Sequence, residues 1–283
     1  MGKMKSSPAA SGVPRHREKQ AENNRKNIKN LEYLVDFALK FGETMLSAGA
    51  NLERVNDTIY RVCDSYGCRE THFFSLNCYL TLSLEDADGN HVSAQRCVRG
   101  GMDTHLENLS KLNQLSREIC ANRPAPRELE SLLADALKTE TYSMQVRLLG
   151  FLLAMTCLTL IFGGSWKDLV TALLNTVLMF LASVYLKKPG VNRMVFNIFS
   201  TFLAGTVAIL MSRIGLVDDI YIVMIVNSMM LIPGIPMVNA FRNLLCGNEI
   251  NGVLEILKTM LETIAIVGGF VLSIFLFGGL IPW

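Results

Sequence analysis

The second half of this 283-residue sequence contains five long stretches without a charged side chain. Each is close to the roughly 17 to 25 residues that a helix needs to cross about 30 Å of hydrocarbon. The stretches are residues 148–166, 169–186, 194–212, 220–241 and 263–283. The sequence therefore predicts a membrane α-helical bundle with five transmembrane helices.

Lysine and arginine in the short connections predict the direction in which these helices cross, because positively charged loops stay in the cytoplasm. Lys187, Lys188 and Arg193 lie between the second and third stretches, and Arg242 and Lys258 lie between the fourth and fifth. The other connections carry no net positive charge. We therefore expect a multi-pass protein of the cell membrane with its N-terminus in the cytoplasm and its C-terminus outside.

The polar first half divides into two segments. Residues 1–30 hold eight Lys or Arg against two Glu, with Ser, Pro and Gly between them, and contain no apolar signal-peptide core. This composition predicts a disordered basic tail. Residues 31–146 carry regular apolar patterns and are expected to form a cytoplasmic α+β domain, followed by the transmembrane domain at 147–283.

Apolar spacing gives the elements of the α+β domain. Helical spacing runs from Leu31 to Met45 and from Leu52 to Tyr66, with Asn51 placed to cap the second helix. Strict alternation from Phe74 to Leu84 then predicts one strand with a single buried face. The turn EDADGN leads into a second strand and so predicts a β-hairpin, and two further helices follow it.

The soluble half contains no strong catalytic or metal-binding motif. No GxSxG, HExxH or P-loop pattern occurs, and none of the seven cysteines forms a CxxC pair, so we expect no disulfide, metal site or cofactor. Cys63 and His72 are the one nucleophile and base that need weighing, but Cys63 adjoins an apolar helical stripe, which is typical of a buried cysteine. The basic tail lacks interleaved aromatic residues, so it predicts no nucleic-acid partner.

The fourth apolar stretch is interrupted by the sequence PGIP. Pro233 and Pro236 lack an amide hydrogen and disrupt a helix, and Gly234 adds backbone freedom, so we expect two half-helices in place of one. Pro236 suits the first position of the second half-helix. A broken helix in a membrane is tolerated where it lines a wet cavity, and the positive end of a half-helix attracts carboxylates.

Three polar residues near the break extend this candidate substrate-binding site, which also includes Pro233, Gly234 and Pro236. Arg242 is placed to reach the same anion, Asn239 lies one turn from it, and Asn227 precedes the break. Other roles stay open: the break as a simple kink, Arg242 as an anchor at the cytoplasmic interface, and the asparagines as interhelical hydrogen-bonding groups.

Groups that could couple export to an ion gradient are scarce, because all five apolar stretches lack Asp, Glu, Lys, Arg and His. Glu255 and Glu262, seven residues apart on one helical face, are the nearest candidates. The alternative is a solvated salt bridge of either carboxylate with Lys258 at the membrane surface. A partner subunit carrying the proton site is a further possibility.

Three segments together resemble the threonine/serine exporter family. GETMLSAGANLERVNDTIYRVCDSYG is similar to its cytoplasmic domain, and YLKKPGVNRMVFNIFSTFLAGTVAIL and LIPGIPMVNAFRNLLCGNEINGVLEIL are similar to its membrane part. Members of this family occur as one long chain with two membrane halves or as two subunits, and this chain resembles the first half. The resemblance implies a second polytopic membrane subunit. It implies export of threonine and serine or, for the split form, of C4 dicarboxylates such as succinate.

We therefore expect a subunit of a secondary-active exporter of small carboxylate-bearing metabolites, and not an enzyme. An inverted pseudo-repeat with its partner is expected, because five crossings leave the chain ends on opposite sides. Two alternatives stay open. A membrane-anchored hydrolase would need an acid, a base and a nucleophile, and a membrane receptor or scaffold would need a cytoplasmic domain that binds a signalling protein.

Overall fold

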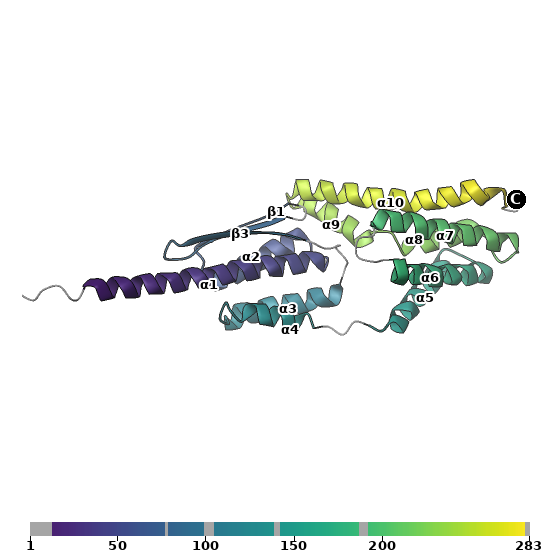
Figure 1. Ribbon diagram of the computed structural model, residues 1–283. Coiled ribbons are helices and arrows are strands. Elements are labelled where there is room, and N and C mark those ends of the chain that lie inside the picture. Colours follow the sequence, from purple (N-terminus) through teal and green to yellow (C-terminus); the bar gives the residue numbers. More distant parts are fainter. Residues whose placement is uncertain (1–12, 77–78, 99–104, 139–141, 187–191, 281–283) are drawn as a thin grey trace, which may run out of the picture. The chain divides into compact units, whose positions relative to one another are not determined.

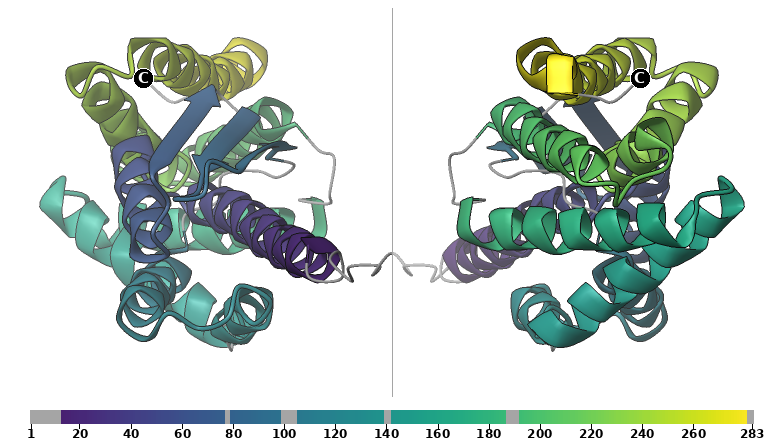
Figure 2. Two further views of the ribbon diagram at one scale, coloured as in Figure 1. Left: turned by 90° about the vertical axis from the view of Figure 1, so that its left-hand side faces the viewer. Right: turned by 90° about the vertical axis from the view of Figure 1, so that its right-hand side faces the viewer.

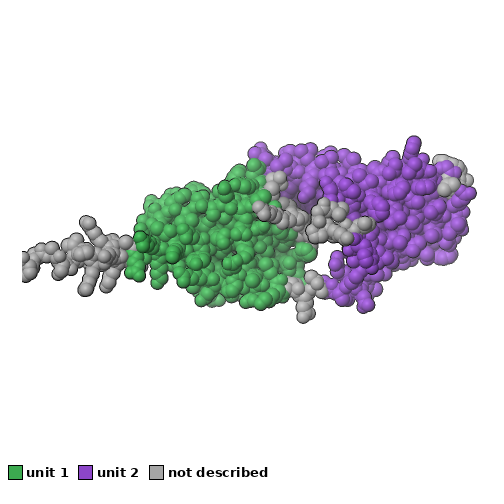
Figure 3. All heavy atoms as spheres, in the orientation of Figure 1, with its two compact units in different colours: residues 1–139 green, residues 140–283 purple. Residues whose placement is uncertain are grey.

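The computed structural model describes residues 13–76, 79–98, 105–138, 142–186 and 192–280. The chain separates into two compact units, residues 1–139 and 140–283, each with its own internal packing (Figure 3). The first unit contains both helices and strands, and in its described residues the second contains helices alone.

The first unit begins with two helices and a sheet. Helices α1 (Val13–Ser47) and α2 (Leu52–Ser65) are followed by strands β1 (Glu70–Leu76), β2 (Tyr79–Glu85) and β3 (His91–Cys97), and then by helices α3 (Leu106–Asn122) and α4 (Leu129–Ala136). The sheet is an antiparallel meander in the order β1-β2-β3. Helix α1 lies beside the sheet, as the left view of Figure 2 shows, and packs on β2 and β3.

Local sequence explains the ends of these elements. The Asn51 side chain accepts a hydrogen bond from the Arg54 amide at 3.2 Å and caps α2, as predicted. Gly49 before it takes a positive φ of 90°, which glycine adopts at little cost after a helix.

On β3, the Arg96 guanidinium binds both Asp36 at 2.9 Å and Glu43 at 3.2 Å, two carboxylates of α1. These ion pairs fix the strand against the helix.

The prediction of a single strand from Phe74 to Leu84 is wrong. The chain reverses between Leu76 and Tyr79, which are paired across β1 and β2. This reversal exchanges the two faces, so Leu80 is fully buried while Phe74 is 61% exposed. The apolar alternation continues through the turn in the sequence. In the structure, however, the even-numbered residues lie on the exposed face in β1 and on the buried face in β2. The predicted hairpin at EDADGN is confirmed, with Glu85 paired to His91.

Helix α1 begins at Val13, inside the segment that the sequence predicts to be a disordered tail. A helix that projects from its unit satisfies its own backbone hydrogen bonds and needs no core of its own. Burial in α1 begins at Leu31, where the apolar stripe begins. The helix therefore starts earlier than predicted, while its packed part agrees with the predicted start of the domain.

In its described residues the second unit consists of six helices and one short 3₁₀ turn. They are α5 (Met144–Ile161), α6 (Trp166–Leu186), α7 (Arg193–Arg213), α8 (Ile220–Met229), α9 (Gly234–Leu245), α10 (Glu249–Phe277) and the turn η1 (Gly278–Leu280). Four helices in the described residues are long and apolar enough to cross a membrane, or up to five spans if α8 and α9 count as one. The last helix starts at Glu249, well before the predicted start of the fifth stretch at residue 263.

Contacts between α7 and α10 show that these two helices run parallel. Arg193 at the start of α7 lies 4.0 Å from the Glu262 carboxylate, and further along both helices Gly205 adjoins Ser273. Figure 1 shows the two helices side by side. Parallel α7 and α10 require that α8 and α9 together return the chain to the end where α7 began. One broken span meets this requirement, whereas a re-entrant hairpin would make α10 antiparallel to α7.

One buried carboxylate joins α6 to the start of α8. Asp168 is almost fully buried, and its Oδ1 accepts hydrogen bonds from the amides of Asp218 at 2.9 Å and Asp219 at 3.0 Å. Its Oδ2 accepts from the Ser165 amide at 2.9 Å. Beside it, the Lys167 ammonium donates to Asp218 and holds the pKa of that carboxyl below its usual value. The hydrogen bonds of Asp168 thus hold the first turn of α6 beside the start of α8.

A pair of adjacent glycines tests the packing of α7 on α10. A Cβ added at Gly269 would lie 2.4 Å from the Ile198 carbonyl oxygen and 2.9 Å from the Phe202 amide nitrogen, and backbone atoms cannot move aside cheaply. A Cβ at Gly268 meets nothing within 4 Å. We expect Gly269→Ala to destabilise the protein by at least about 1–3 kcal/mol, the usual cost of overpacking. Gly268→Ala should be neutral.

Thermal unfolding of the two variants purified in detergent measures this difference directly. The control is internal, because both variants make the same chemical change in the same helix, one residue apart. Equal melting temperatures for Gly268→Ala and Gly269→Ala would contradict the close α7–α10 contact.

Candidate functional site

The break in the fourth span lies between α8 and α9, whose axes differ in direction by 60°. Helix α9 begins at Gly234 with Pro233 as its cap. Pro236 is therefore the third residue of the helix, whereas the sequence predicted that it would be the first. Proline is tolerated there because the first turn of a helix has no partner for its amide hydrogens. The predicted two half-helices are present.

Few amide hydrogens remain free at the start of α9. A regular helix leaves about four amides unbonded there. Pro233 and Pro236 have no amide hydrogen, and the Gly234 amide donates to the Ile232 carbonyl at 2.9 Å. The start of α9 therefore offers a carboxylate fewer backbone N–H donors than the start of a regular helix does. Gly234 has room for a Cβ within this chain and no positive φ, so neither crowding nor backbone conformation requires glycine there.

Arg242 and Asn239 lie on α9 beyond the break. Arg242 is exposed on the surface of this chain, in the last turn of α9, whereas Asn239 is half-buried. Arg242 is eight residues past Gly234, which corresponds to about 12 Å along a helix at roughly 1.5 Å per residue. The neighbouring exposed side chains of α9, Phe241 and Leu245, are apolar. The guanidinium therefore occupies a mostly apolar face at a distance from the break.

Asn227, the sixth predicted binding residue, lies in the last turn of α8 and is 1% exposed. Neither its amide nitrogen nor its amide oxygen has a hydrogen-bond partner. Such groups are uncommon, because a buried polar atom without a partner costs about 1–3 kcal/mol. Asn227 is thus the predicted residue with the clearest unmet capacity to bind a ligand.

Glu255 does not form a simple solvated pair with Lys258. Its Oε2 accepts a hydrogen bond from Asn243 Nδ2 of α9 at 2.9 Å, and Asn243 is buried. Sequence reasoning missed Asn243, although its position four residues after Asn239 places both amides on one face of α9. Lys258 is exposed.

Glu262 lies in the middle of α10 and is 2% exposed. Its carboxylate faces α7, where the Arg193 side chain approaches to 4.0 Å. The interpretation of Glu262 as part of a solvated surface salt bridge is therefore wrong. Because α10 continues through residue 262 as one helix, this residue packs against α7 and away from solvent. Arg193, and not Lys258, is therefore the cation that pairs with the buried Glu262 carboxylate.

The buried polar atoms without a partner gather in the second unit. In the described residues they include atoms of five side chains there, namely Asn175, Asn197, Ser200, Asn227 and Asn243. The buried asparagines Asn175, Asn197 and Asn227 thus have hydrogen-bonding atoms that no other helix satisfies. Ser200 was not predicted, because an isolated serine in an apolar stretch gives no signal of its own.

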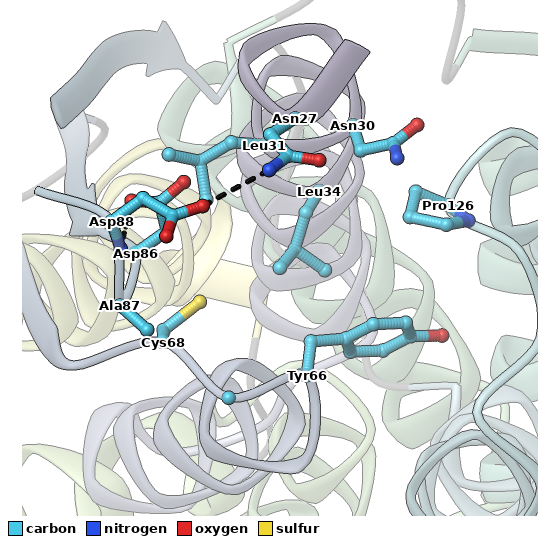
Figure 4. Close-up of a pocket in the computed structure, with 11 residues that line it drawn as sticks. Asn27, Asn30, Leu31, Leu34, Tyr66, Cys68, Asp86, Ala87, Asp88 and Pro126 are labelled. Atoms are coloured by element: carbon cyan, nitrogen blue, oxygen red, sulfur yellow. Dashed lines mark hydrogen bonds between the residues drawn. The ribbon is translucent and has the colours of Figure 1, made fainter. Parts of the chain in front are cut away.

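The first unit contains a separate depression of about 350 Å³ (Figure 4). It is lined by α1, by the end of α2 and by the β2–β3 turn, where Asn27 Nδ2 donates to Asp88 Oδ2 at 3.0 Å. Burial raises the pKa of the Cys68 thiol on its wall to about 11, so this thiol stays protonated at neutral pH. The Asp86 carboxylate accepts hydrogen bonds from the Asp88 and Asn90 amides of its own turn.

The nucleophile and base considered in the sequence are not poised for catalysis. Cys63 is fully buried, and burial raises the pKa of its thiol far above the ordinary value. His72 is exposed on β1, where it lies 3.5 Å from Glu70. Across the described parts of the chain, no group of three or more His, Cys, Asp or Glu could hold a metal ion.

Comparisons with known proteins identify relatives of the chain. The model of a family described as putative threonine/serine exporter (ThrE) matches residues 36–277. The threonine/serine exporter of Corynebacterium glutamicum is 22% identical over 247 residues, which cover 85% of this chain and 50% of that protein. The chain therefore spans about half the length of this curated relative. No solved structure matches it.

Proposed function

Because the chain belongs to the family of putative threonine/serine exporters, we propose that it is a membrane subunit of a secondary-active exporter of small carboxylate-bearing metabolites. The candidate substrates are threonine and serine, or C4 dicarboxylates such as succinate. The observation that carries this proposal is the family match across both units, including the broken span. A transporter rather than an enzyme is what this family implies.

A second polytopic subunit completes the proposed exporter. The chain covers half of a relative that is itself named as an exporter, and in this proposal a second polytopic protein supplies a membrane half similar to the rest of that relative. The proposed partner lies against the exposed face of α9 that carries Arg242, where the substrate carboxylate would also be received. The partner would cover this face and form the other wall of the pathway.

The proposed substrate path follows the broken span. Arg242 and Asn239 would receive the substrate carboxylate at the cytoplasmic end, because arginine makes strong, paired hydrogen bonds with carboxylates. The bend at Pro233, Gly234 and Pro236 would lead it to Asn227. Bare backbone at such a bend is stable where it lines a polar path.

The proposed coupling group is Glu262, assisted by Glu255. Glu262 is buried against Arg193 at the contact of α7 with α10, so gain or loss of its proton would change the attraction that joins these helices. Glu255 links α10 to α9 through Asn243, next to the proposed path. Both carboxylates thus lie where a proton could alter helix packing.

The orientation is testable by labelling. The positive charges in the connections predict that the first unit lies in the cytoplasm. In a variant without native cysteines, a membrane-impermeant maleimide added to intact cells should label Ile214→Cys, which is exposed between α7 and α8. It should not label Ala87→Cys, which is exposed in the β2–β3 turn, until the cells are opened. Labelling of Ala87→Cys in intact cells would reverse the proposed orientation.

Export assays test the function itself. Cells loaded with radiolabelled threonine or succinate should release one of them faster when they express the chain together with its polytopic partner than when they express either protein alone. An inactive control is Gly269→Ala with the partner, because the α7–α10 contact is then disturbed. Equal release from cells with and without the two subunits, at confirmed membrane levels, would overturn the exporter proposal.

Arg242 variants test the carboxylate contact. Loss of a charge-assisted hydrogen bond of about 1.5–3 kcal/mol should raise the half-saturating internal substrate concentration about tenfold or more in Arg242→Ala. Arg242→Lys should be intermediate, because an ammonium cannot bind both carboxylate oxygens in the same planar geometry. Arg117→Ala, the same substitution at an exposed arginine of α3, is the matched control and should export normally.

The alternative role for Arg242, an anchor at the membrane surface, gives a different result. Arg242→Lys would then match the wild type, and Arg242→Ala would reduce the amount inserted and not the apparent affinity. Export rates normalised to the protein present in the membrane separate the two roles.

A further inference from the structure

Helices α6, α7 and α8 pack against one another in all three pairings. Each carries a fully or almost fully buried polar side chain with an atom that has no hydrogen-bond partner. These are Asn175 Oδ1 at 0% exposure, Ser200 Oγ at 0%, and both Oδ1 and Nδ2 of Asn227 at 1%.

The Asp168 contact gives the relative heights of α6 and α8. Asp168 accepts the amide of Asp219, so these two residues are level, and the helices run in the same direction from there. Asn175 is seven residues beyond Asp168, and Asn227 is eight residues beyond Asp219. At roughly 1.5 Å per residue, the two asparagines differ in height by only about 1.5 Å.

Helix α7 brings Ser200 to the same junction. Asn175 Nδ2 donates to the Ala204 carbonyl at 3.1 Å, which sets Ala204 beside the asparagine layer. Ser200 precedes Ala204 by four residues and lies on the same face of α7. Ala208, one turn further along that face, packs in a buried cluster with Val223 and Met224 of α8. Since α7 and α8 are antiparallel, Ser200 lies on the side of the layer toward the break.

The unmet hydrogen bonds make this layer unfavourable when it is empty. Each buried polar atom without a partner costs about 1–3 kcal/mol, and hydrocarbon around the bundle supplies no water to replace the partner. Asn175 must point Nδ2 at the Ala204 carbonyl, so its oxygen is the free atom. Apolar residues of similar size would pack without this cost. A bound polar ligand would remove it.

We propose that Asn175, Asn227 and Ser200 form the central binding site for the transported molecule, and that its ligand is an amino-acid zwitterion. The ammonium group would donate to the two free amide oxygens. The carboxylate would accept from Asn227 Nδ2 and from the Ser200 hydroxyl, both of which are donors. This inference rests on the proposed export function and assigns its site to named side chains.

The same donor and acceptor pattern disfavours a dicarboxylate. A dianion has only acceptor oxygens, and two of the free atoms, Asn175 Oδ1 and Asn227 Oδ1, are acceptors as well. Their lone pairs would face the second carboxylate with no hydrogen between them. A ligand that carries both donors and acceptors satisfies every free atom of the layer, whereas a dianion leaves the two amide oxygens unpaired.

Thermal unfolding of the purified full chain, with L-threonine or succinate as the probe, tests the site. Threonine should raise the melting temperature of the wild type, and succinate should not. Asn227→Leu, which keeps the size of the side chain, should melt at the same or a higher temperature without ligand, because it removes two unpaired atoms. It should lose the threonine-dependent rise. Asn175→Leu should weaken threonine binding about tenfold or more through loss of its acceptor.

Matched controls separate a binding role from a structural one. Ser200→Ala should weaken binding, whereas Ser183→Ala on α6, whose hydroxyl bonds the Phe180 carbonyl, should leave it unchanged. A structural role predicts that Asn227→Leu melts well below the wild type, and that result would overturn the proposal. A threonine-dependent rise retained in Asn227→Leu would overturn it too.

Export measured in parallel distinguishes failure of this inference from failure of the exporter function. Cells that export threonine normally with the Asn227→Leu subunit would remove the site and leave the exporter function standing. A wild-type chain stabilised by succinate and not by threonine would overturn the assignment of the ligand. Absence of both stabilisation and export of either compound in the wild type would overturn the exporter function, and the binding site with it.

Discussion

Hydrocarbon offers no hydrogen bonds, and this constraint governs the second unit of the protein. Every polar group at membrane depth must find its partner within the protein or on a ligand. Asp168 meets the requirement fully, with three amide donors around its carboxylate. The layer of Asn175 and Asn227 does not, and the broken helix beside it removes further backbone partners. Satisfied and unsatisfied groups thus mark different roles in the same bundle.

Close contact between α7 and α10 supplies the fixed part of this arrangement. At Gly269 the backbones of the two helices approach each other closely, which is typical of tightly packed membrane helices. Further along, the contact changes character, because Glu262 and Arg193 bring opposite charges to the same interface. The α7–α10 contact thus combines a close backbone approach at one end with a buried ion pair at the other.

The break itself contributes less to anion binding than its sequence suggests. The same prolines that interrupt the helix also remove amide donors from the new helix end, and Gly234 uses its own amide locally. Side chains must therefore supply most of the contacts with a ligand. The proposed contacts with a ligand therefore come from the amides of Asn227 and Asn175 and from the Arg242 guanidinium, and the proposed second subunit would cover the exposed face of α9.

The membrane helices, the break between α8 and α9, and the helical and extended parts of the first unit can be predicted from the sequence alone. Uncharged length, missing amide hydrogens and apolar period are properties of short segments, so they can be read without knowing what packs on them. Family membership was likewise carried by local motifs. Asn227 could be named from the sequence because it lies close to PGIP along the chain.

Tertiary structure alone decided which residues meet. Periodicity could not show that the chain reverses before Tyr79, because the apolar alternation continues through a turn that exchanges the two faces of the sheet. Nor could it show that Glu262 faces Arg193, or that Asn175 is level with Asn227, since each pair joins helices far apart in sequence. The heights of helices depend on anchors such as Asp168, and only packing in three dimensions sets those.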